Sequence, residues 1–238
     1  MPAKLRILCL HGFTSNGAVH AYQARRITAL LPSNYEFIFP DGPHIVPSSD
    51  IKDAAWHSYV SANSTTGHRA WWFARDSNIA KNSSYLPGDQ GGYYGIEESL
   101  KYLSELIAKD GPVHAIWGFS QGACFAGMVM AMLSEKSTDP LDLRQYLPKE
   151  QRSPLAGIFF GGFKARFQQY QSLYEMGVQV PTLHVMGKND LLVPVERSEG
   201  LAETCEGAEV LKHQNGHNLP KEKAQVERIV EFLTKNVR

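Results

Sequence analysis

The sequence predicts an α/β fold, in which a doubly wound and mainly parallel six-stranded sheet carries helices on both of its faces. Two observations lead to this prediction. Short β-rich runs alternate with segments of helical periodicity along the 238 residues. In addition, the first, third, fourth and fifth strand candidates are apolar or nearly so on both faces, which is typical of parallel strands covered by helices from either side.

The strand candidates follow one another at intervals that leave room for crossover helices. In chain order they are Leu5–Leu10, Glu36–Pro40, Val113–Trp117, Leu155–Phe160, Thr182–Met186 and Glu209–Lys212. Two of the intervening helices show clear apolar stripes, one at Ile96, Leu100, Leu103 and Ile107 and one at Val226, Ile229, Val230 and Leu233. With right-handed crossovers we expect the strand order 2-1-3-4-5-6, which reverses between strands 1 and 3.

Two stretches interrupt this rhythm. Residues 42–92 follow the second strand, are rich in Ser, Asn, Gly and aromatic residues, and show no clear periodicity. A segment this long inside a compact domain is usually functional, so we expect a lid-like or substrate-loop insertion in a single α/β domain spanning residues 1–238. Residues 134–153 contain several prolines and are expected to form a short helix and a loop over one edge of the sheet.

Composition narrows the classes of function. Lys and Arg together number 24, as do Asp and Glu, and no basic run is present, so we expect no nucleic-acid partner. The longest apolar stretch, 123–133, is too short to span a bilayer, and the N-terminus lacks the layout of a signal peptide. Three scattered cysteines, Cys9, Cys124 and Cys205, are expected to be small hydrophobic side chains in a reduced, cytoplasmic setting.

The most informative motif is the pentapeptide 118–122, which reads Gly-Phe-Ser-Gln-Gly and matches G-x-S-x-G. An apolar strand candidate precedes it and a long apolar segment follows it, as in a nucleophile elbow that exposes a strained serine between a strand and a helix. Glycines on either side let the strand and the helix approach closely. The motif therefore predicts that Ser120 is a nucleophile, against the alternative of a glycine-rich turn with a solvated serine.

A serine hydroxyl needs a base to accept its proton. In α/β-hydrolases, which carry this elbow, the partners follow in the order serine, acid, histidine, and the histidine comes after the last strand. His217 has that position. The other histidines fit less well: His184 lies within a strand, His114 and His213 belong to strand ends, and His44, His57 and His68 precede the elbow.

The acid is expected after a later strand, where Asp190 follows the strand candidate ending at Met186. Asp190 could also be an ordinary turn residue, because Asn-Asp after a strand is common turn chemistry. Asp139 and Asp142 lie in the proline-rich interruption and are better interpreted as solvated loop acids or caps. The position of Asp190 relative to His217 favours the catalytic interpretation.

An oxyanion hole requires two backbone donors. The Gln121 amide is expected to be one, because it starts a helix and has no intrahelical acceptor. The Phe13 amide is the other candidate, since the loop after the first strand, residues 11–15, begins His-Gly as in the oxyanion loops of hydrolases. No metal or cofactor is expected.

Several segments together resemble one family. These are residues 7–13 (ILCLHGF), 40–44 (PDGPH), 70–73 (AWWF), 118–122 (GFSQG) and 216–220 (GHNLP). The combination resembles the FSH family, compact serine hydrolases of the α/β-hydrolase class that are common in fungi. The resemblance implies esterase or thioesterase chemistry without a cofactor and a triad of Ser120, Asp190 and His217. Because some fungal members release polyketide chains from a carrier protein, it also implies an acyl-carrier protein as a partner.

The expected reaction is acyl transfer from a small ester or thioester to Ser120, followed by hydrolysis. Trp71, Trp72 and Phe163 could wall an apolar acyl pocket, although aromatic side chains at 71 and 72 could equally anchor the long insertion to the core. Non-hydrolytic members of the same fold, such as perhydrolases, lyases or ligand-binding modules, are the alternative class.

Overall fold

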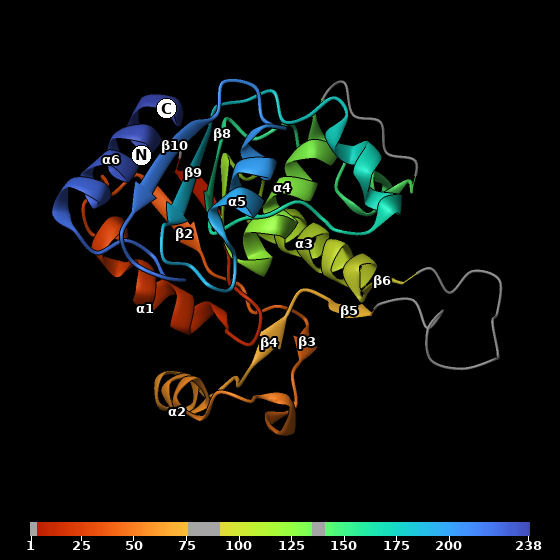
Figure 1. Cartoon of the computed structure of the whole chain (residues 1–238). Coiled ribbons are helices and arrows are strands. Elements are labelled where there is room, and N and C mark those ends of the chain that lie inside the picture. The colour runs from red at the N-terminus through yellow and green to blue at the C-terminus, as the bar shows by residue number, and fades with distance from the viewer. Residues whose placement is uncertain (1–3, 76–90, 135–140) are drawn as a thin grey trace, which may run out of the picture.

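The computed structural model describes residues 4–75, 91–134 and 141–238 of the chain (Figure 1). The strands are β1 (Leu5–Leu10), β2 (Tyr35–Ile38), β3 (His44–Ile45), β4 (Arg69–Ala70), β5 (Phe73–Arg75), β6 (Gly92–Tyr94), β7 (Ala115–Phe119), β8 (Ala156–Phe160), β9 (Thr182–Gly187) and β10 (Glu209–His213). The α-helices are α1 (Gly17–Thr28), α2 (Ala54–Asn63), α3 (Ile96–Asp110), α4 (Gln121–Leu133), α5 (Val195–Ala202) and α6 (Lys223–Asn236). Short 3-10 helices cover Ser48–Asp50, Leu143–Tyr146 and Gln168–Tyr174.

The central sheet has six strands in the order β2-β1-β7-β8-β9-β10, and every neighbouring pair is parallel. Counted in chain order, these six strands run 2-1-3-4-5-6, which confirms the predicted topology. The order reverses between β1 and β7. Loops that leave the carboxyl ends of these two strands therefore diverge, and the crevice between them is where doubly wound sheets place their sites.

Apolar side chains of the central strands alternate between two hydrophobic clusters, one on each face of the sheet. In β1, Leu8 and Leu10 join the cluster under α3 and α4, while Ile7 and Cys9 join the cluster under α1 and α6. Figure 1 shows the same division, with α1 and α6 on one side of the sheet and α3, α4 and α5 on the other. Burial on both faces is the reason that these strands are apolar throughout.

The insertion after β2 is more regular than predicted. Its described residues form the helix α2 and the short strands β3 to β6, which lie outside the central sheet, with β3 paired to β4 and β5 paired to β6. Each of these strands has only two or three residues, too few for an alternating pattern to be visible in the sequence. Residues 76–90 of the predicted insertion, and 135–140 of the second interruption, lie outside the described residues.

The strand before the elbow begins and ends two residues later than predicted, at Ala115 and Phe119. Val113 lies outside the strand because the side-chain amide of Gln151 binds both of its backbone groups, at 2.9 Å to N and 3.0 Å to O. At the other end Phe119 still pairs with Phe160 of β8. Consequently the strand runs directly into Ser120.

Candidate active site

Ser120 occupies a strained turn between β7 and α4. Its φ of 55° and ψ of −116° lie in a region that L-residues rarely adopt. The turn is fixed by hydrogen bonds on both sides: the Ser120 amide donates to the Phe160 carbonyl at 2.8 Å, and the Ser120 carbonyl accepts from Ala123 and Cys124 at 3.0 Å. The strain is therefore held by the surrounding sheet and helix, and it projects the side chain away from both.

The two glycines of the elbow are required by close backbone approach. A Cβ atom on Gly118 would overlap the carbonyl oxygen of Gly122, and one on Gly122 would overlap the carbonyl oxygen of Leu10. Neither carbonyl can move, because one belongs to the helix and the other to the central strand. This is the packing that the G-x-S-x-G pattern predicts.

His217 and Asp190 form a close pair after β10 and β9. Nδ1 of His217 lies 2.6 Å from Oδ2 of Asp190, and the other carboxylate oxygen accepts the amides of Leu192 and Val193 at 2.9 and 2.8 Å. Because Oδ1 is occupied by these two donors, Oδ2 is directed at the imidazole. The carboxylate can only accept, so Nδ1 carries the hydrogen and Nε2 is the basic nitrogen. The ring also packs on Phe119, with centroids 4.7 Å apart.

Ser120 and His217 line the same cavity, which has a volume of about 580 Å³. Its other lining residues are Gly12, Phe13, Thr14, Ser15, Gln23, Asp53, Trp56, Phe119, Phe163, Leu192, Val193 and Arg197. The structure thus brings Ser120, His217, Phe13 and Phe163 to one cavity, with Asp190 behind the histidine. These residues come from the loops after β1, β7, β8, β9 and β10, all at the carboxyl edge of the sheet.

The two predicted oxyanion donors belong to segments that adjoin Ser120. Gln121 begins α4, and a Cβ atom on Gly12, the neighbour of Phe13, would lie 3.3 Å from the Ser120 Cβ. Within the described residues neither the Phe13 amide nor the Gln121 amide has a hydrogen-bond acceptor. Both are therefore available to a developing negative charge beside the serine.

The side chain of His11 fixes the loop that carries Phe13 through two hydrogen bonds. Burial lowers the pKa of His11 to about 4, so the ring is neutral. Its Nδ1 hydrogen is directed at the Gly12 carbonyl at 2.7 Å, and its Nε2 accepts the Gly42 amide at 2.8 Å. This histidine is a structural link between the loop and the start of the insertion.

The same loop is held from the other side by the insertion. The Thr14 carbonyl, in a residue with a φ of 59°, accepts from Nε1 of Trp56 at 2.9 Å and from Nδ1 of His68 at 2.6 Å. Positive φ is costly for a residue other than glycine, and two donors on one carbonyl compensate for it. Neither donor could be predicted from the sequence, because both lie in a stretch without periodicity.

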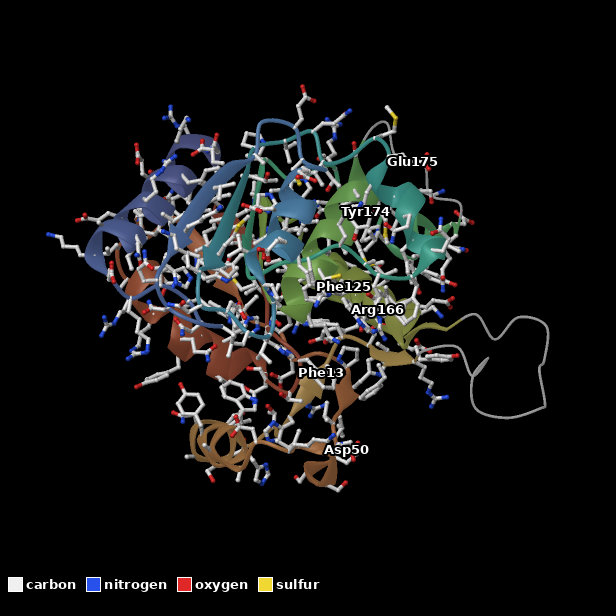
Figure 2. All side chains as sticks on the ribbon, in the orientation of Figure 1. Phe13, Asp50, Phe125, Arg166, Tyr174 and Glu175 are labelled. Atoms are coloured by element: carbon white, nitrogen blue, oxygen red, sulfur yellow. The ribbon has the colours of Figure 1, made fainter. Side chains whose placement is uncertain are left out.

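Trp71 and Trp72 do not line the cavity, which corrects their predicted role as walls of an acyl pocket. They are 0% and 3% exposed and pack against Phe125 in the core. The backbone N of Trp71 and O of Trp72 bind the side-chain amide of Gln121, both at 2.9 Å. In Figure 2 Phe125 lies within the main body, whereas Phe13 lies where that body meets the insertion. The two tryptophans anchor the insertion to the core.

Phe163, by contrast, lines the cavity, with the Arg197 guanidinium 4.4 Å from its ring centroid. Leu192 and Val193 also line the cavity and were not among the predicted site residues. The signal was present: an apolar run that begins at Leu191 directly follows Asp190, and Leu191 and Leu192 are 93% and 71% exposed. Apolar residues exposed beside a candidate acid indicate a substrate surface.

Residues 4–75, 91–134 and 141–238 show neither the pattern of a metal site nor that of a membrane-spanning helix. There, no three His, Cys, Asp or Glu side chains are grouped as metal ligands would be. Nor does any helix in these ranges combine the length and apolarity that crossing a bilayer demands. All three cysteines are buried and unpaired.

A strained serine at the end of a parallel strand, beside a paired histidine and aspartate, defines the α/β-hydrolase class. The family model described as serine hydrolase (FSH1) matches residues 1–229, and the chain belongs to this family of serine hydrolases. It is 30% identical to the protein named Esterase CG5412 of Drosophila melanogaster over 97% of this chain and 74% of that one. It is also 30% identical to the protein named Esterase OVCA2 of Danio rerio, with 96% of each chain covered.

Solved structures show the same fold at much lower identity. Acyl-protein thioesterase 2 of Zea mays superposes with a TM-score of 0.60 at 17% identity, covering 98% of this chain and 94% of that one. The protein described as esterase PE8 gives a TM-score of 0.61 at 18% identity, covering 99% and 94%.

Proposed function

We propose that this serine hydrolase cleaves carboxylic esters or thioesters through an acyl-enzyme on Ser120. The observation that carries the proposal is the pairing of His217 with Asp190 at 2.6 Å, with Ser120 and His217 in one cavity. The esterases among the relatives of the chain support the same chemistry. The proposal includes residues 42–92 as a substrate loop of the same domain, because Asp53 and Trp56 line the cavity.

The residues take the following roles. Nε2 of His217 removes the proton from Ser120 as the hydroxyl attacks the carbonyl carbon, and Asp190 stabilises the imidazolium that forms. The amides of Phe13 and Gln121 bind the oxyanion, where a lost donor typically costs about 10²–10³ in rate. His217 then protonates the leaving oxygen or sulfur, and water hydrolyses the acyl-enzyme by the reverse proton transfers.

The acyl group is assigned to the apolar side of the cavity, formed by Phe119, Phe163, Leu192 and Val193. A cavity of about 580 Å³ accommodates medium-length chains more completely than acetyl. A series of p-nitrophenyl esters tests this assignment, and we expect kcat/KM to rise from acetate to hexanoate. Acetate as the fastest substrate would contradict it.

Ser120→Ala tests the proposed function itself. Removal of the nucleophile is expected to reduce turnover of p-nitrophenyl butyrate by about 10⁴–10⁶ and to abolish labelling by a fluorophosphonate. Near-normal activity in S120A, or labelling that persists in it, would overturn the proposal. Mass spectrometry of the products distinguishes hydrolysis from perhydrolysis, and competition between an acyl-carrier thioester and simple esters tests the carrier as partner.

A further inference from the structure

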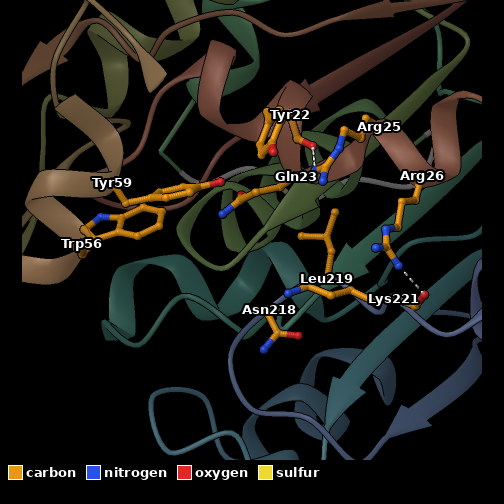
Figure 3. A pocket seen from close by; sticks show the side chains of 9 residues that line it. All are labelled: Tyr22, Gln23, Arg25, Arg26, Trp56, Tyr59, Asn218, Leu219 and Lys221. Atoms are coloured by element: carbon orange, nitrogen blue, oxygen red, sulfur yellow. Dashed lines mark hydrogen bonds between the residues drawn. The ribbon is translucent and has the colours of Figure 1, made fainter. Parts of the chain in front are cut away.

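A second hollow lies next to the catalytic cavity, between α1, α2 and the loop after β10 (Figure 3). Its volume is about 400 Å³. Its lining residues are Tyr22, Gln23, Arg25, Arg26, Trp56, Tyr59, Asn218, Leu219 and Lys221, and we call this hollow the basic groove. Of the described residues, three cationic side chains and no carboxylate line it, so the groove is positively charged although the chain as a whole has a net charge of zero.

The two arginines of the basic groove are held in place, and none of its three cations is paired with a described carboxylate. Arg25 lies 3.8 Å from the ring centroid of Tyr22 and donates to its carbonyl at 2.6 Å, and Arg26 donates to the Lys221 carbonyl at 3.1 Å. No carboxylate in the described part of the chain lies within ion-pair distance of Arg25, Arg26 or Lys221. Guanidinium groups that are oriented and still have free N–H donors are suited to bind phosphate.

An aromatic wall faces these cations. The rings of Trp56 and Tyr59 from α2 stack with centroids 5.5 Å apart and an interplanar angle of 25°. In Figure 3 the two rings lie across the groove from Arg26 and Lys221. The groove therefore presents a flat apolar surface opposite positive charge, which suits an amphipathic ligand with an anionic group.

The basic groove adjoins the catalytic cavity near His217, the proposed general acid for the leaving group. Gln23 and Trp56 line both hollows, and Asn218 and Leu219 directly follow His217. The leaving oxygen or sulfur must lie at Nε2 of His217 to receive its proton, so the leaving group extends on that side of Ser120. The acyl chain lies on the other side, among apolar residues.

We propose that the basic groove binds the leaving group of the substrate, and that this group carries a phosphate. The inference rests on the proposed function, because it assigns a direction to the same acyl transfer. Ser120 attacks the substrate carbonyl, the carbonyl–oxygen or carbonyl–sulfur bond breaks, and His217 passes the proton taken from Ser120 to the phosphate-bearing alcohol or thiol, which departs through the groove. Water then attacks the acyl-enzyme, and the acid leaves as Ser120 regains its proton.

Thioesters that share one hexanoyl chain and differ in the thiol test the proposal. Pantetheine carries no phosphate, whereas 4′-phosphopantetheine and coenzyme A do. At low ionic strength we expect kcat/KM for the phosphate-bearing thioesters to exceed that for the pantetheine thioester by at least about fivefold, the value of one partly exposed ionic contact. The ratio should shrink as salt is added. A fourth substrate carries the hexanoyl group on the phosphopantetheine of a carrier protein. If its kcat/KM exceeds that of the free phosphate-bearing thioesters, the natural leaving group is carrier-bound; if it is lower, the leaving group is free.

The variant Arg25→Gln/Lys221→Gln should bring the ratio of the two kcat/KM values close to one. Lys109→Gln removes an exposed cation on α3, outside the groove, and should leave the ratio at its wild-type value. Equal kcat/KM for all thioesters in the wild type, or a ratio that survives R25Q/K221Q, would overturn the leaving-group site alone. If no thioester or p-nitrophenyl ester is cleaved and Ser120 is not labelled, the proposed function fails together with it.

Discussion

Gly161 gives the sharpest test of the geometry at His217, because the structure leaves no room for a side chain there. It follows β8 with a φ of 53°. A Cβ atom at this position would lie 3.2 Å from Cε1 and 3.3 Å from Nδ1 of His217, and 3.5 Å from Oδ2 of Asp190. Carbon atoms in contact settle at about 3.5–4.0 Å, so Gly161→Ala must displace the imidazole by a few tenths of an ångström.

The backbone cost and the catalytic cost of this change can be separated. Alanine with positive φ costs about 1 kcal/mol of unfolding free energy wherever it occurs. Gly207 has a φ of 65° and nothing within 4 Å of the same atom, so Gly207→Ala carries the backbone cost without a contact. Since a misplacement of about 1 Å costs about 10²-fold, we expect Gly161→Ala alone to lower kcat/KM by about tenfold.

The assay pairs urea unfolding with hydrolysis of p-nitrophenyl butyrate for both variants. The expected result is a loss of stability in G161A at least as large as in G207A, and a loss of activity in G161A alone. If G161A keeps the wild-type kcat/KM while it loses as much stability as G207A, the imidazole is not fixed where the structure places it.

Three further predictions concern Asp190, His68 and the two buried histidines His20 and His184. Asp190→Asn should lower kcat/KM by about 10⁴ with an unchanged circular dichroism spectrum, because the amide favours the wrong imidazole tautomer; a loss below tenfold would contradict this. His68→Phe removes a donor to the Thr14 carbonyl and should lower kcat about tenfold at constant KM, and His68→Asn, whose amide can donate from the position of Nδ1, should restore it; an effect on KM alone would argue against the brace. Burial lowers the pKa of His20 to about 3 and that of His184 to about 4, below the ordinary 6.5. Unfolding therefore takes up protons, and stability is complete above pH 6.5 and falls as the pH drops from 6.5 towards 4, by about 1.4 kcal/mol per unit for each histidine. Urea unfolding at about pH 7.5 and about pH 5 measures this loss, and a wild-type pH dependence in His184→Leu would refute the assignment to that residue.

The features that were predictable from the sequence are those fixed by backbone packing. Gly118 and Gly122 are needed because a strand and a helix meet at Ser120, and that need appears directly as a pattern of residue types. The pairing of Asp190 with His217 could be predicted because parallel topology brings the ends of successive strands to one edge of the sheet. Each of these inferences depends on chain order and not on the detailed packing of side chains.

The parts that could not be predicted depend on how the insertion folds back. The apolar pattern of a buried strand is absent from β3, β4, β5 and β6, which are too short to show one. The sequence does not show whether Trp71 and Trp72 line the cavity or pack in the core, because an aromatic pair is equally suited to both. In the structure both tryptophans lie in the core, where the Gln121 side chain binds the backbone N of Trp71 and the backbone O of Trp72.

The insertion is hydrogen-bonded to the loop after β1, which carries Phe13, at several points. The Arg69 amide donates to the Ser15 carbonyl at 2.7 Å, Nδ2 of Asn16 donates to the Gly67 carbonyl at 2.8 Å, and Nε1 of Trp71 donates to the His11 carbonyl at 2.8 Å. An oxyanion hole stabilises charge only if its donors are oriented before the charge develops. Because the loop bearing one proposed donor is held by these bonds, changes deep in the insertion should act on kcat even where they touch no substrate.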